Sequence, residues 1–281
     1  MDRKEYYMEM TEPIGLVYNC ITKASNNPFH FHDNYEIYIF LSGDVDCFIE
    51  QSCYRLERGH LIVFNDREIH RVCYYGELPY ERRVLHISPK IIQSLSTDKS
   101  NLLNCFENRK LGANNIVLLQ EQLLNEILDM FEKLKYITSS SPYGSDVLSN
   151  AYLSILLALI NKAFHENHDI APISATRSHN LIPDILSFID SSIGQNLSLQ
   201  MIARHFSIDR YYLCHIFKEK TGTSLYQYIL LKKISLAKYY LTERKSVTEV
   251  CTLSGFNDYS NFIRTFKKVT GVSPGKYASR Q

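Results

Sequence analysis

One short segment of the chain, together with a later histidine, carries side chains that could bind a ligand: His30, His32, Glu36 and His70. Because side chains alternate along a strand, the even-numbered residues from 30 to 40 would share one face, which adds Tyr38 and Phe40. Turned inward, this face would form a pocket with a polar mouth and an aromatic floor, which suits a ligand of sugar size. The imidazole and carboxylate groups could instead hold a divalent transition metal. They could also be satisfied by hydrogen bonds and bind nothing.

A further histidine, His86, lies in a later strand-like run and could line the same cavity. A lone histidine on a strand is more often structural, so His86 is not among the predicted ligand residues. Those residues are His30, His32, Glu36, Tyr38 and His70.

A repeat in the last third of the chain carries residues that could read DNA. Residues 209–228 and 258–277 share seven identical residues at an offset of 49, without a gap. Asp209 and Asp258 are placed to cap the start of a helix, and Gly222 and Gly271 to end it. A duplicated helical unit is therefore predicted.

A short helix is also predicted just before each copy of the repeat. Ser198 would begin the first of these, and Ser246 the second, where Glu249 completes a capping box. Helix, tight turn and second helix make a helix-turn-helix. A spacer helix is expected over 225–241 and a preceding helix over 182–193. The second helices should bury Leu213, Ile216 and Phe217 in one copy and Phe262 and Phe266 in the other.

The outward residues of each second helix would enter the major groove. Arg264 is the best candidate for a base contact, because a guanidinium can bond O6 and N7 of guanine together. It could instead contact a phosphate or pair within its own domain. The lysines could bind phosphates or simply face solvent. The predicted DNA-contacting residues are Arg210, Tyr211, Cys214, His215, Lys218, Tyr259, Ser260, Asn261, Arg264 and Lys267.

The elements that must position the first set of residues are short strands. Strand-like runs at 35–40, 46–50, 60–64 and 83–87 are separated by turn signals, as in a small antiparallel barrel or sandwich. Two apolar-patterned segments follow, at 117–136 and 147–164, and both are predicted to be helices. The second could pack on the barrel or form part of a dimer interface.

The two halves of the chain differ in net charge. The length of 281 residues fits two domains. Residues 1–178 carry 17 basic and 23 acidic residues, whereas residues 179–281 carry 14 basic and 7 acidic residues. The basic half therefore suggests a polyanionic partner. Seven scattered cysteines favour reduced thiols in a cytoplasm over disulfides or a zinc module. We expect neither a secretory signal nor a membrane span, because the longest apolar stretch, 151–160, is too short.

The repeated region resembles the paired helix-turn-helix region of AraC-type transcriptional regulators over about 100 residues. The matching residues are Gly255, Phe256, Asp258, Ser260, Phe262, Arg264, Phe266, Lys267, Gly271, Ser273, Pro274 and Tyr277. His215 stands where the family often has arginine. The segment from His30 to His70 is similar to the two cupin motifs of the sensor domains of that family, with Asn65 and Arg67 in place of the usual proline and glycine.

The resemblance implies an α+β chain: a cupin-like barrel with a helical hairpin over 1–170, a linker over 171–180, and an all-α DNA-binding domain over 181–281. It implies a homodimer that binds double-stranded DNA and senses a small molecule, expected to be a sugar. Activation is expected over repression, and an activator would also contact RNA polymerase. No cofactor, no enzyme activity and no membrane partner are expected. The alternatives are a metal-dependent cupin enzyme or metal sensor at His30, His32, Glu36 and His70, and a DNA-binding scaffold without a ligand.

Overall fold

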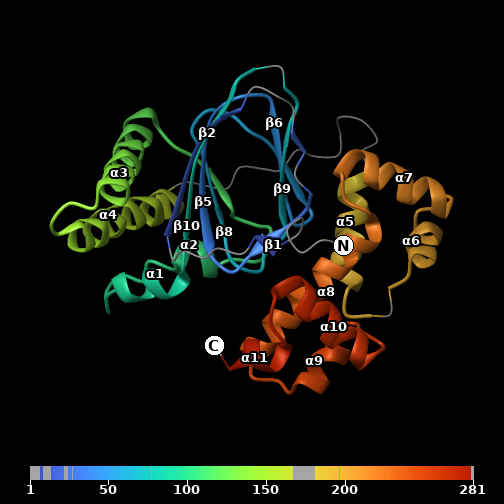
Figure 1. The fold of residues 1–281 in the computed structure, drawn as a ribbon. Helices are drawn as coiled ribbons and strands as arrows, with labels where there is room; N and C mark the ends of the chain where they lie inside the picture. Colours follow the sequence, from blue (N-terminus) through green and yellow to red (C-terminus); the bar gives the residue numbers. More distant parts are fainter. Residues whose placement is uncertain are drawn as a thin grey trace.

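The computed structural model describes residues 7–8, 14–21, 25–26, 28–76, 78–166, 181–195 and 197–279. A β-barrel lies at the centre, with α3 (Glu121–Ser140) and α4 (Ser145–Glu166) on one side and the helices of the C-terminal half on the other (Figure 1). The predicted linker over 171–180 lies outside the described residues. The mixed α+β class predicted from the sequence is confirmed.

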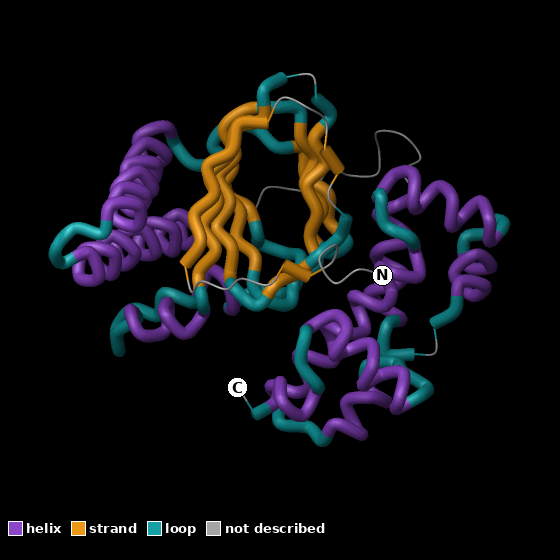
Figure 2. The backbone as a smooth tube through the Cα atoms, viewed as in Figure 1, coloured by secondary structure: helices purple, strands orange, loops and turns teal. Residues whose placement is uncertain are grey.

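The barrel is built from two antiparallel sheets that face each other (Figure 2). The five-stranded sheet has the order β11 (Ile116–Leu118), β8 (His60–Phe64), β5 (Tyr35–Ser42), β10 (Tyr80–Ile87) and β2 (Ile14–Ile21). The four-stranded sheet has the order β3 (Ser25–Asn26), β9 (His70–Tyr74), β6 (Val45–Ile49) and β7 (Ser52–Arg55). A short parallel pair joins β1 (Tyr7–Met8) to β4 (Phe31–His32). All four predicted strand runs are present.

Alternation along β5 sorts its side chains between two cores, as the sequence predicts. Tyr38 and Phe40 face the barrel interior, where they pack with residues of both sheets. Ile37 and Ile39 face outward and pack against the helical hairpin. The even-numbered face of this strand is therefore the one that a ligand inside the barrel would meet.

Two short helices, α1 (Pro89–Leu95) and α2 (Asn104–Glu107), precede the α3–α4 hairpin. The expected helix over 117–136 begins later than predicted. Ile116 to Leu118 instead form β11, because their backbone groups pair with the free edge of β8. Among the described helices, α4 has the length and composition that could span a membrane, but its buried residues pack into the core of the hairpin and the barrel.

The C-terminal half contains two helix-turn-helix units, as predicted. The first comprises α6 (Leu199–His205) and α7 (Arg210–Thr221), and the second comprises α9 (Val247–Leu253) and α10 (Tyr259–Thr270). Helix α8 (Leu225–Thr242) joins them, α5 (Leu181–Ser192) precedes them, and α11 (Pro274–Ala278) ends the described chain. Asp209 and Asp258 accept the capping hydrogen bonds, and Gly222 and Gly271 end the helices in the left-handed region.

The two units differ by one residue in the turn, because their first helices are offset by 48 residues and their second helices by 49. In the longer turn Gly255 adopts φ +78°, and a Cβ atom there would lie 2.5 Å from the carbonyl oxygen of Ile193. Only glycine fits this position without a backbone shift. One predicted core residue, Ile216, is only partly buried, whereas Leu213, Phe217, Phe262 and Phe266 are fully buried.

Candidate functional site

Glu36 lies at the centre of a buried histidine cluster in the barrel. Antiparallel pairing of β5 with β10 places His86 directly opposite Glu36. From Oε2 of Glu36 the distances are 2.8 Å to Nε2 of His32, 3.4 Å to Nε2 of His70 and 3.8 Å to Nδ1 of His86. The structure thus brings three of the predicted ligand residues together and adds His86, which the sequence analysis left out.

His30 occupies the edge of this cluster. It is partly buried, and its ring centroid lies 4.5 Å from that of His70. Its Nδ1 atom bonds the carbonyl oxygen of Pro28. His30 therefore neighbours the cluster without a hydrogen bond to Glu36.

Backbone carbonyl groups fix which nitrogen of two rings carries a proton. Nδ1 of His32 lies 2.6 Å from the carbonyl oxygen of Asn34, and Nδ1 of His70 lies 3.0 Å from that of Glu68. A carbonyl oxygen only accepts, so each Nδ1 donates. In a neutral ring each Nε2 then presents a lone pair toward the Glu36 carboxylate. Such an arrangement needs either a second proton on a ring or a cation between the ring and the carboxylate.

The charges of the cluster follow from its burial. Burial alone would raise the pKa of Glu36, but the neighbouring histidines hold it well below its usual range. Burial lowers the pKa of His86 to about 4 and that of His30 to about 3. Burial also opposes the charged form of His70, but its contacts with Glu36 raise its pKa. Without a cation, His70 is therefore a histidine of the cluster whose charged form the Glu36 carboxylate favours.

A second set of polar side chains, from Tyr38, Tyr80 and Arg82, lies in the same barrel interior. The hydroxyl groups of Tyr38 and Tyr80 are 2.5 Å apart, and Nη1 of Arg82 donates to the Tyr80 hydroxyl. The Arg82 guanidinium also lies 4.8 Å from the centroid of the Tyr80 ring. Its Nε atom is buried without a hydrogen-bond partner among the described residues. Tyr38 thus faces the barrel interior as predicted, whereas Tyr80 and Arg82 were not among the predicted ligand residues.

The candidate nucleic-acid interface is formed by the outward faces of α7 and α10. Most predicted contact residues on both helices are exposed, and Cys214 and Asn261 are partly buried. On α10, Nη2 of Arg264 donates to Oδ1 of Asn261 at 3.1 Å. On α7, the equivalent position holds His215, whose Nδ1 lies 3.8 Å from Oε2 of Glu219. Arg264 and His215 therefore each have a polar neighbour on their own helix. In a complex with DNA, a base edge could take the place of that neighbour.

Helix α8 connects this interface to the barrel. Nζ of Lys238 lies 3.0 Å from Asp33, the residue that follows His32, and also donates to the carbonyl oxygen of Asp66. Nζ of Lys232 donates to Glu50 and to Asp190. Lys238 is fully buried and Lys232 nearly so. The sequence signal for these contacts is limited to the presence of Lys232 and Lys238 in the amphipathic stretch 225–241, which also contains Lys233.

An apolar core runs across the same boundary. Phe29, Phe31 and Phe48 of the barrel belong to one cluster with the buried residues of the C-terminal helices. The ring of Phe29 packs edge-on against Tyr228 of α8 with centroids 4.9 Å apart. Its backbone N–H donates to the hydroxyl group of Thr223. The barrel and the helix-turn-helix units therefore share a packed interface centred on α8.

Comparison with known proteins matches each half of the chain to a protein family. Residues 17–157 match the AraC-like ligand binding domain family, and residues 202–280 match a helix-turn-helix domain family. The Msm operon regulatory protein of Streptococcus mutans is 30% identical over 47% of this chain and 48% of its own length. The melibiose operon regulatory protein of Escherichia coli is 22% identical over 88% of this chain and 82% of its own. The transcriptional activator RhaR of Mannheimia succiniciproducens is 24% identical over 90% of this chain and 87% of its own length.

Proposed function

Since the chain belongs to the AraC-type family of transcriptional regulators, we propose that it is a cytoplasmic, sequence-specific activator controlled by a carbohydrate bound in its barrel. The observation that carries this proposal is the connection of a buried polar cluster to two exposed recognition helices through α8. We propose regulation and not catalysis as its role, because the relatives named above are regulatory proteins.

The carbohydrate assignment is supported by the chemistry of the barrel interior. Glu36, His70 and Arg82 offer charged hydrogen-bonding groups, and Tyr38 and Tyr80 add hydroxyl groups and aromatic faces. Hydroxyl-rich ligands use such a mixture of polar groups and apolar faces. One relative is named for the melibiose operon, which also favours a sugar.

For ligand binding to control DNA binding, the ligand must bind one arrangement of the two halves of the protein better than another. Asp33 provides a direct route, because it follows His32 in the chain and pairs with Lys238 of α8. A ligand that moves the segment from His30 to Glu36 would change this contact. Helix α8 would then change the relative positions of the two recognition helices.

The ligand assignment predicts a thermal shift of the full chain. A sugar at about 100 times its dissociation constant adds about 2.7 kcal/mol, which raises the melting temperature by roughly 5–10 °C. The His32→Ala variant should lose this shift, whereas His205→Ala, on the exposed end of α6, should keep it. A screen of mono- and disaccharides that leaves the melting temperature unchanged would exclude the carbohydrate assignment.

Metal sensing is the second candidate function, and one observation favours it. The ligand atoms of His32, Glu36 and His86 all lie within 4.8 Å of one another. Nε2 of His70 and Nδ1 of His86 are buried without a hydrogen-bond partner among the described residues. Repeating the melting experiment with a chelator tests this candidate. A melting temperature that falls with chelator and recovers with a divalent transition metal supports it, and an unchanged one excludes it.

Specific DNA binding predicts a distinct effect of Arg264. The Arg264→Ala substitution should cost about 1–3 kcal/mol of binding and relax the preference at one base pair. The Lys267→Ala substitution should weaken binding evenly across sequences, because a phosphate contact carries no sequence information. A binding-site selection on both variants measures this difference. If Arg264→Ala keeps the wild-type base preference, Arg264 does not read a base.

Dimerisation is proposed for the α3–α4 hairpin. The hairpin exposes the apolar residues Tyr136, Val147 and Leu148. Tyr136, Leu148 and Tyr152 line a groove of about 310 Å³ there. An exposed apolar surface of this kind is typical of a protein interface. Sedimentation velocity of the full chain, compared with the Val147→Glu variant, tests this, and a monomeric wild-type chain would exclude it.

Activation is the proposed direction of control, and the activator RhaR is one of the relatives that support it. An activator at a promoter contacts double-stranded DNA and RNA polymerase. Transcription in vitro from a bound promoter, with and without this protein, distinguishes activation from repression.

A further inference from the structure

Arg82 of β10 places a permanent positive charge inside the barrel. Residues 80, 82 and 84 share one face of this strand, and Tyr80 and Val84 pack in the barrel interior. The guanidinium carbon of Arg82 lies 4.8 Å from the centroid of the Tyr80 ring and 5.9 Å from that of Tyr38 on β5. Because arginine does not lose its proton in proteins, this charge is present at every pH at which the protein is folded.

The hydrogen bonds of Arg82 leave one edge of its guanidinium free. Its only hydrogen bond among the described residues runs from Nη1 to the Tyr80 hydroxyl, which is neutral. Its Nε atom is buried without a partner. Nε and Nη2 form one fork of the planar group, and a carboxylate accepts two parallel hydrogen bonds from such a fork. The free edge of Arg82 therefore fits a carboxylate.

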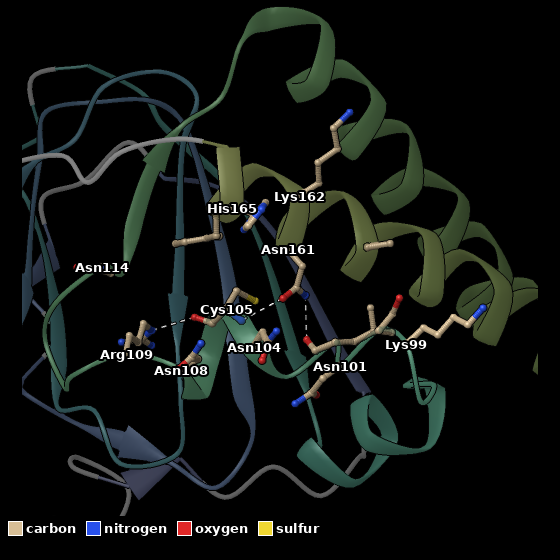
Figure 3. A pocket seen from close by; sticks show the side chains of 14 residues that line it. Lys99, Asn101, Asn104, Cys105, Asn108, Arg109, Asn114, Asn161, Lys162 and His165 are labelled. Atoms are coloured by element: carbon tan, nitrogen blue, oxygen red, sulfur yellow. Dashed lines mark hydrogen bonds between the residues drawn. The ribbon is translucent and has the colours of Figure 1, made fainter.

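Other arginines of the same half have carboxylate partners within the chain. Arg109 lines a groove of about 580 Å³ between α2 and α4 (Figure 3), and both of its Nη atoms donate to Glu68. Arg83, the next residue on β10, lies 3.0 Å from Glu81. In the part of the chain that the structure describes, Arg82 has no such partner. A charge in a barrel interior is costly unless it is paired, which indicates that the anion comes with the ligand.

The register of β5 and β10 places this cation along the same interior face as the histidine cluster. Pairing sets Arg82 opposite Phe40 and His86 opposite Glu36, and Tyr38 lies between these two pairs. Burial lowers the pKa of His86 to about 4, and the Arg82 cation contributes to this lowering, so the two groups lie within electrostatic reach. A ligand on this face would meet the cation at one end and the cluster at the other.

The cluster decides the orientation of such a ligand. Nδ1 of His86 and Nε2 of His70 are buried without hydrogen-bond partners among the described residues, and both can bond hydroxyl groups. The Glu36 carboxylate lies 3.4 Å from His70 and would repel a second carboxylate. The carboxylate of the ligand is therefore expected at Arg82, and its hydroxyl groups are expected at the cluster.

We propose that the barrel ligand is a sugar acid of the hexuronic type, with its carboxylate bound by Arg82. This inference rests on the carbohydrate ligand proposed above and names its charged group. A carboxylate matches the single positive charge of Arg82, whereas a phosphate carries a charge of about −1.5 to −2 near neutral pH. The ring of Tyr38, between the two polar ends, offers an aromatic face to the sugar ring.

Isothermal titration of the full chain with matched pairs of sugars tests the proposal. Galacturonate and galactose differ only at the sixth carbon, as do glucuronate and glucose. In at least one pair the acid should bind at least about tenfold more tightly, because it gains charge-assisted hydrogen bonds. The Arg82→Gln variant should remove this preference and keep the affinity for the neutral sugar. The matched control is Arg83→Gln on the opposite face of β10, which should keep the preference.

The melting temperature of the ligand-free Arg82→Gln variant separates binding from folding. It should equal or exceed that of the wild-type chain, because the substitution removes an unpaired charge. A lower melting temperature, together with loss of the neutral sugar, would show that Arg82 supports the fold and would overturn the proposal.

The remaining outcomes separate this inference from the carbohydrate assignment. Equal affinity for acid and neutral sugar, or a preference that survives Arg82→Gln, overturns the sugar acid and leaves the carbohydrate ligand standing. Equally tight binding of cyclohexanecarboxylate overturns the sugar part, and equally tight binding of galactose 6-phosphate overturns the carboxylate. Absence of binding in both pairs contradicts this inference, and a flat screen of all the mono- and disaccharides contradicts the carbohydrate assignment as well.

Discussion

Replacing Lys232 with methionine is expected to separate the unfolding of the barrel from that of the helix-turn-helix units. Methionine keeps the apolar stem of the side chain but leaves Glu50, which is 1% exposed, without its cationic partner. Removing one partner of a buried ion pair costs about 3–5 kcal/mol. Because Lys232 lies on α8 and Glu50 follows β6 of the barrel, this cost falls on the interface between them.

The charge states of Lys232 and its partners support the expected loss of stability at this interface. Burial alone would lower the pKa of Lys232, but the Glu50 carboxylate raises it, so the ammonium form is retained. Asp190 of α5 lies 2.5 Å from the same Nζ atom and joins a third element to the contact. Lys232 thus links the barrel to both α5 and α8.

Calorimetry of the Lys232→Met variant should resolve two transitions where the wild-type chain has one. If our coupling proposal is correct, the variant should also bind DNA with the same affinity in the presence and absence of the barrel ligand. The control is Lys268→Met, because Lys268 is exposed on α10. A single transition at the wild-type temperature in Lys232→Met would show that this contact does not hold the two halves together.

The helix-turn-helix units were predictable because their signals are local. Capping residues, the helix-ending glycines and the repeat itself lie within a few residues of the helix ends that they specify. Asp209 and Asp258 cap the helices as predicted, and the additional residue in the second turn is visible in the sequence. The barrel strands were predictable for the same reason, since alternation is a local pattern.

The prediction of a helix from residue 117 was wrong because a distant partner decides the conformation of that segment. The apolar spacing from Leu119 to Leu134 fits a helix, and most of these residues are buried in one. Ile116 and Val117 instead add a strand to the edge of β8, more than fifty residues earlier. No local pattern distinguishes an apolar segment that extends a helix from one that completes a sheet.

The contacts between the halves could not be predicted for a similar reason. A lysine in a helix usually faces solvent, and only the position of Glu50, 182 residues away, makes burial of Lys232 possible. His86 is a different case, because its sequence signal existed. Alternation along 83–87 places His86 on the same face as Val84, which packs in the barrel interior. The register between β10 and β5, which only the structure supplies, then sets it opposite Glu36.

The Arg109→Met substitution should destabilise the barrel by about 3–5 kcal/mol, because it leaves a buried carboxylate unpaired. Glu68 is fully buried and accepts two hydrogen bonds of 2.5 Å from the Arg109 guanidinium. The backbone N–H groups of Asn65 and Gly112 also donate to it. The pair thus ties the turn before β9 to the loop that follows α2.

Chemical unfolding of single and double variants measures this pair. The Arg109→Met/Glu68→Gln variant should lose less stability than the sum of its single substitutions, since a neutral amide still accepts the backbone hydrogen bonds without leaving a buried charge. The control is Arg58→Met, whose ion pair with Glu121 is exposed and should contribute about 0–1 kcal/mol. If Arg109→Met costs no more than Arg58→Met, the buried pair does not hold the loop after α2 in place.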